Sequence, residues 1–93
     1  MEFELPAPFL LGRIVATRNA AESISPGDML SGLSRHCACD WGDLDPDDRA
    51  LNNLAVFDEG RLVSAYHDSD GQKFYIITEW DRSATTILLP EDY

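Results

Sequence analysis

Basic side chains are scarce in this chain. Seven Lys and Arg stand against seventeen Asp and Glu among 93 residues, which gives a formal charge of −10 at pH 7. Because proteins that bind nucleic acid neutralise its phosphates with Lys and Arg, we do not expect direct nucleic-acid binding. An anionic membrane surface would repel the chain for the same reason. The charge favours a basic protein surface as the partner.

Cysteines and long apolar runs are also scarce. The two cysteines, Cys37 and Cys39, are too close in sequence to close a useful disulfide loop. No apolar stretch approaches the length of a membrane span, and the acidic first residues are unlike a signal peptide. These absences predict a reduced, cytoplasmic protein. The length and the 44% hydrophobic content predict one domain over residues 1–93 with its own core.

Two helix starts carry capping signals that include a proline. Ser25 precedes Pro26 and Asp45 precedes Pro46, and an acid follows at the third helical position in both. A side-chain oxygen at the N-cap accepts from free backbone N–H groups, and proline is tolerated at the first helical position. The pattern predicts one helix with Met29, Leu30, Leu33 and Cys37 on its apolar face, and a second that continues through Leu51, Leu54, Ala55 and Phe57, with Asn52 and Asn53 in water and Gly60 as its stop.

Four segments have the character of strands. They are residues 10–17, 62–67, 73–80 and 85–89, and the last three are separated by short turns. Such turns predict an antiparallel meander. The expected fold class is α+β, with two helices packed on one face of an antiparallel sheet in the order β-α-α-β-β-β, after an irregular lead-in over residues 1–9. The pattern leaves open whether the first strand joins an edge of the meander.

Metal-ligating residue types occur without a metal-binding spacing. His36, Cys37 and Cys39 lack the gap of a zinc knuckle. The aspartates that begin at Asp43 match the first three positions of an EF-hand loop, but its sixth position is Asp48 and its twelfth is Leu54. We therefore expect no metal and no cofactor.

Catalytic candidates are few. A cysteine could pair with His36 or His67, or a ribonuclease-like toxin could use these histidines with Arg49 or Tyr75. Nearby carboxylates raise a thiol pKa, and an RNA substrate needs positive charge to hold it. The sequence therefore predicts a protein that is not an enzyme.

The most unusual stretch of the chain is a dense block of acids over residues 40–48, here called the acidic segment. One interpretation is a solvated loop with a helix cap. The other is an imitation of nucleic-acid charge, because carboxylates on adjacent helical turns lie about 5–6 Å apart, similar to successive phosphates. The tryptophan within it is either a plug at the rim between helix and sheet or an interface anchor. The candidate partner-binding residues are Asp40, Trp41, Asp43, Asp45, Asp47 and Asp48.

Two motifs resemble those of small proteins from bacterial plasmids and integrative elements, named "plasmid-related protein". One is the DWGDLDP stretch within residues 35–48, and the other is DRSATTILLPEDY within residues 71–93. Family members often carry a glycine before DWG, where this chain has Cys39, which weakens any cysteine-based site. The resemblance implies a mobile-element setting and no particular activity.

By analogy, small acidic proteins of such elements are often inhibitors of host defence. We therefore expect a non-catalytic inhibitor of the anti-CRISPR or anti-restriction type, which occupies a basic nucleic-acid-binding surface of a defence complex. The alternatives are an accessory or regulatory interaction domain without a defence role, which could form a homo-oligomer, and a small enzyme or toxin.

Overall fold

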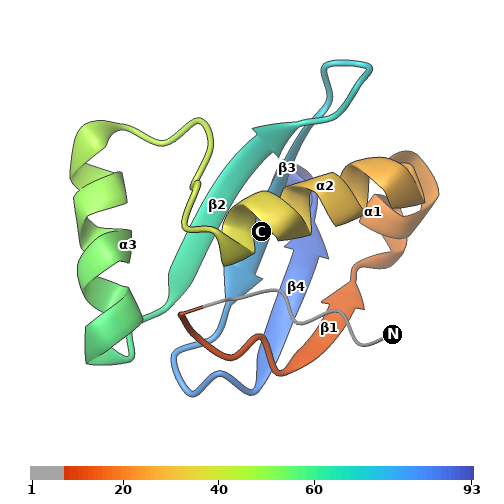
Figure 1. Cartoon of the computed structure of the whole chain (residues 1–93). Coiled ribbons are helices and arrows are strands. Elements are labelled where there is room, and N and C mark those ends of the chain that lie inside the picture. The colour runs from red at the N-terminus through yellow and green to blue at the C-terminus, as the bar shows by residue number, and fades with distance from the viewer. Residues whose placement is uncertain (1–7) are drawn as a thin grey trace, which may run out of the picture.

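The computed structural model describes residues 8–93, which form a four-stranded sheet, three α-helices and a short 3-10 helix (Figure 1). Residues 1–7 of the expected lead-in lie outside the described residues. The elements in chain order are β1 (Arg13–Ala16), α1 (Arg18–Ser23), α2 (Pro26–Cys37), α3 (Pro46–Asp58), β2 (Leu62–His67), β3 (Lys73–Thr78), β4 (Ala84–Leu88) and η1 (Pro90–Asp92).

The sheet has the strand order β1-β4-β3-β2. Strands β2, β3 and β4 form the predicted antiparallel meander. Strand β1 pairs with β4 in parallel, so it joins one edge of the meander and makes the sheet mixed. The α+β class is thus confirmed, and the position of the first strand, which the sequence left open, is at the β4 edge.

Both predicted helix caps are present. The Ser25 hydroxyl accepts from the Asp28 backbone N–H at 3.1 Å, and the Asp45 carboxylate accepts from the Asp48 N–H at 2.9 Å. Helix α1 was not predicted. It begins after Thr17, whose hydroxyl accepts from the backbone of its first turn, and it connects β1 to α2 along the chain.

Helix α2 crosses one face of the sheet, whereas α3 lies beside β2 (Figure 1). The core beneath α2 consists of apolar side chains from α1, the sheet and the chain after β4. A smaller cluster joins the start of the described chain to the acidic segment and β2. The members are Ala20, Ile24, Tyr66, Phe74, Ile76, Ile87 and Leu89 in the first cluster, and Phe9, Trp41 and Leu62 in the second.

Candidate functional site

The acidic segment begins with an aspartate that is already paired. The Arg35 guanidinium donates to both carboxylate oxygens of Asp40, with Nε–Oδ2 at 2.7 Å and Nη2–Oδ1 at 3.3 Å. This arginine holds the pKa of Asp40 below its ordinary value, and a bond from the Gly42 backbone acts in the same direction. Asp40 is exposed, but its charge is compensated within its own segment.

Trp41 is buried and 3% exposed. Its indole N–H donates to Asn53 Oδ1 at 2.9 Å, and its ring lies 6.3 Å from the Phe9 ring and 5.5 Å from the His36 ring, centroid to centroid. The plug interpretation of this tryptophan is therefore confirmed. Its indole is not accessible to a partner, so it is removed from the set of direct contacts.

The residues around Gly42 close one edge of the sheet. Strand β2 is an edge strand, and the Ala65 N–H donates to the Trp41 carbonyl at 3.1 Å while the Asp43 N–H donates to the Ala65 carbonyl at 2.8 Å. This one-residue parallel bridge places Gly42 opposite Ala65. An exposed edge strand invites pairing with other chains, and here the acidic segment prevents it at Ala65.

Asn52 of α3 closes the same edge two residues earlier. Its amide N–H donates to the Val63 carbonyl at 2.7 Å, and its Oδ1 accepts from the Val63 N–H at 3.2 Å. The amide thus replaces the backbone of a neighbouring strand. The expectation that Asn52 faces water was wrong, since this residue is only 5% exposed. It turns inward because the backbone groups at the edge of β2 need a hydrogen-bonding partner.

Replacing Asn52 by alanine should lower the free energy of unfolding by about 1–3 kcal/mol, because a half-buried N–H and C=O of Val63 lose their partners. Urea unfolding followed by circular dichroism measures this. Gln72→Ala is the control, since Gln72 is exposed in the turn between β2 and β3, and it should change stability by less than about 0.5 kcal/mol. Equal effects of the two variants would contradict the edge-closing role of Asn52.

The remaining predicted acids differ in their surroundings. Asp43 Oδ2 lies 2.6 Å from His67 Nδ1. Asp45 is the N-cap of α3. Asp47 and Asp48 are exposed in the first turn of α3 and form no ion pair with residues 8–93. The unpaired part of the acidic block is therefore the start of α3.

Helix α3 carries an apolar ridge on its outer surface. Leu51, Leu54 and Phe57, here called the α3 ridge, are 63%, 60% and 84% exposed. Their expected burial was wrong, because α3 lies beside β2 and turns Asn52, Ala55 and Val56 toward the protein. The sequence spacing marks one side of a helix but does not say which side meets the sheet, so the ridge was missed as a surface feature.

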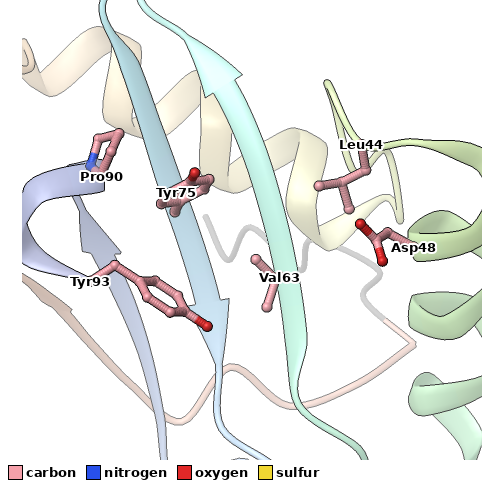
Figure 2. Close-up of a pocket in the computed structure, with 6 residues that line it drawn as sticks. All are labelled: Leu44, Asp48, Val63, Tyr75, Pro90 and Tyr93. Atoms are coloured by element: carbon pink, nitrogen blue, oxygen red, sulfur yellow. The ribbon is translucent and has the colours of Figure 1, made fainter.

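A hollow of about 460 Å³ lies over β2 and β3, on the face of the sheet that α2 does not cover (Figure 2). Figure 2 shows Val63 and Tyr75 at its floor, with the chain end on one side and the start of α3 on the other. The rings of Tyr75 and Tyr93 pack edge to face at 6.0 Å. The lining residues are Leu44, Asp48, Val63, Tyr75, Pro90 and Tyr93.

A second hollow of about 290 Å³ continues this surface toward α3. It shares Leu44, Asp48 and Val63 with the first and extends to Leu51 of the ridge and to Arg61. The Arg61 guanidinium pairs with Glu79 at 3.5 Å and lies 5.7 Å from the Tyr93 ring. The open sheet face, the start of α3 and the ridge thus form one connected, mainly apolar and acidic surface.

Two of the catalytic candidates, His36 and Cys37, are buried. Burial raises the pKa of the thiols of Cys37 and Cys39. The His36 side chain is fully buried, and its ring nitrogens contact Ser64 and Thr78. Within residues 8–93, neither cysteine thiol hydrogen-bonds to an imidazole, no cluster of three metal-ligating side chains occurs, and no helix is long and apolar enough to span a membrane.

No protein-family model, curated protein sequence or solved structure significantly matches this chain.

Proposed function

We propose that this chain is a non-catalytic inhibitor of the anti-CRISPR or anti-restriction type, which occupies a basic nucleic-acid-binding surface of a bacterial defence complex. The proposal rests on one observation about the outer side of α3. Unpaired acids of the first turn of this helix lie beside the exposed α3 ridge, in a chain with a formal charge of −10.

The distribution of basic side chains supports an acidic outer surface. Three arginines pair with neighbouring acids, as Arg18 with Glu22, Arg35 with Asp40 and Arg61 with Glu79. Arg49 and Arg82 donate to backbone carbonyls, which fixes their positions within the fold. Five of the seven basic side chains therefore contact acids or backbone carbonyls of the chain itself. The excess acids then determine the electrostatic field that a partner meets.

The proposed contact set differs from the acidic block as read from the sequence. Asp45, Asp47 and Asp48 remain at the start of α3, and Asp58 and Glu59 add two exposed acids at its other end. Carboxylates on successive turns are about 5–6 Å apart, which suits side chains that otherwise grip phosphates. The ridge between the two acidic ends adds apolar burial, which commonly supplies the binding energy at an interface whose charges give rate and specificity.

A specific observation also favours the alternative, an accessory interaction domain of a mobile element without a defence role. Strand β1 leaves an unpaired sheet edge among the described residues, and such an edge suits self-association. Binding to defence complexes separates the two functions, because only the inhibitor requires it.

Changing Asp47 and Asp48 together to lysine should weaken binding to a defence complex at least about tenfold, chiefly through a slower association rate. The wild-type protein is tested by surface plasmon resonance against purified Cas9 with guide RNA, a multisubunit CRISPR effector complex and a restriction endonuclease, each with and without its target DNA. Bound DNA should block the inhibitor. The double variant is then tested on the complex that binds.

The matched control is Glu22→Lys with Asp70→Lys, which makes the same charge change at exposed acids outside α3. It should retain most of the affinity, with the remaining loss due to net charge. Absence of binding to every complex in the set would overturn the proposal. Binding that both double variants weaken equally would remove α3 as the contact surface.

A further inference from the structure

The two edge strands of the sheet differ in whether their outward backbone groups are hydrogen-bonded. At β2, the bridge at Gly42 and the amide of Asn52 occupy the outward backbone groups of Ala65 and Val63. At β1, no segment within residues 8–93 pairs with the outer side of the strand. The fold therefore leaves β1 as the edge that can accept another strand.

The register shows which groups of β1 are free. The Arg13 N–H donates to the Ser83 carbonyl at 3.0 Å, and the Thr17 N–H donates to the Ile87 carbonyl at 2.9 Å. These residues direct their backbone toward β4, and backbone direction alternates along a strand. The N–H and C=O groups of Ile14 and Ala16 therefore point away from the sheet.

An apolar groove of about 420 Å³ accompanies this edge, between the sheet and α2. Ile14 on β1 is 51% exposed, and Leu30 on α2 is 62% exposed. Leu30 was expected on the buried face of its helix, so its exposure leaves apolar surface uncovered. No charged side chain lines the groove, whose residues are Ile14, Val15, Ala16, Pro26, Met29, Leu30, Leu33 and Ile87.

The absence of charge decides which occupant fits. Two copies of a chain with a formal charge of −10 repel each other where their acids meet, so a surface without acids is where their association is opposed least. The groove presents no carboxylate with which a basic partner could pair. A second copy meets an identical apolar groove and an identical strand edge, which a two-fold axis makes complementary.

We propose that β1 pairs with β1 of a second copy in antiparallel orientation, about a two-fold axis at Val15. In that register, Ile14 and Ala16 exchange backbone N–H···O bonds with Ala16 and Ile14 of the other copy. The two four-stranded sheets become continuous, and Leu30 of each copy, which lines the groove along β1, lies beside the joined edges. This dimer does not depend on the proposed inhibitor function.

Analytical ultracentrifugation at micromolar concentrations tests the dimer. The wild-type protein should sediment with twice the 10.4 kDa mass of one chain. Ala16→Pro removes an outward N–H while the inward bonds to β4 remain, and proline is tolerated at such an edge position. Leu30→Lys adds a charge to the groove from an exposed position. Both variants should sediment as monomers with unchanged circular dichroism.

Leu54→Lys is the matched control, because it makes the same exchange at an equally exposed leucine of the α3 ridge. It should remain dimeric. A wild-type protein that sediments at the mass of one chain overturns the proposal. So does a dimer that persists in both Ala16→Pro and Leu30→Lys.

Discussion

Replacing Gly42 by alanine should lower the free energy of unfolding by at least about 3 kcal/mol, a large part of the stability of a small domain. The Gly42 backbone has φ +74°, and an added Cβ would lie 1.9 Å from the Ala65 carbonyl oxygen and 2.8 Å from Cδ1 of Tyr66. The oxygen belongs to the backbone of β2 and cannot rotate away. Urea unfolding followed by tryptophan fluorescence measures the loss.

Gly71→Ala separates backbone strain from collision. Gly71 also has a positive φ, +83°, but an added Cβ there meets no heavy atom within 4 Å. That variant should lose only about 1–2 kcal/mol, the cost of a left-handed alanine. If Gly71→Ala and Gly42→Ala lost the same amount, the close approach to Ala65 would not be what requires glycine at Gly42.

The expected size of this effect follows from what Gly42 connects. On one side, Trp41 fills the small core cluster, and on the other, Asp45 begins α3. The bridge to Ala65 holds both against β2. The DWG sequence thus docks the acidic segment on the sheet, and it fixes the position of the α3 surface on which the proposed function rests.

The parts of the fold that were predictable depend on residues close in sequence. Ser25 and Asp45 reach backbone N–H groups three residues ahead, so their caps could be read from short patterns. The meander followed from turns of a few residues. The Thr17 cap was equally local, but the Arg18–Ser23 helix that it begins is too short to show a hydrophobic period.

The parts that were missed depend on contacts between distant segments. The parallel pairing of β1 with β4 joins segments about seventy residues apart, such as Arg13 and Ala84. The inward turn of Asn52 depends on the unpaired edge of β2. Within the candidate site, five exposed aspartates could be predicted from composition. Their division into paired and unpaired groups could not, because the partner of Asp43, His67, lies at the end of β2, 24 residues further along the chain.

A buried hydrogen-bond chain fixes the state of His36. Thr85 donates to the Leu11 carbonyl at 2.7 Å, so its hydroxyl accepts from Thr78 at 2.8 Å. Thr78 must then accept from His36 Nε2, also at 2.8 Å. Because burial lowers the pKa of His36 to about 4, Nδ1 carries no proton near neutral pH and accepts from the Ser64 hydroxyl. The imidazole is therefore neutral with its proton on Nε2, and the chain ties α2 to three strands.

Stability should fall by about 3 kcal/mol as the pH decreases from 6.5 to 4, because burial lowers the pKa of His36 from 6.5 to about 4. In that interval the unfolded chain binds a proton that the folded protein excludes, so protonation favours unfolding. The contribution is complete above pH 6.5 and lost below about pH 4. Urea unfolding at a series of pH values measures it.

His36→Gln is the informative variant, because it removes the titrating group from the buried chain. It should be less stable than the wild type near neutral pH, and its stability should change little between pH 6.5 and 5. The carboxylates of Asp28 and Asp92, whose hydrogen bonds lower their pKa values below 3.8, contribute stability that is lost mainly at still lower pH. A variant that kept the full wild-type slope above pH 5 would show that the slope arises elsewhere, whereas a flat variant assigns it to the buried imidazole that joins α2 to the sheet.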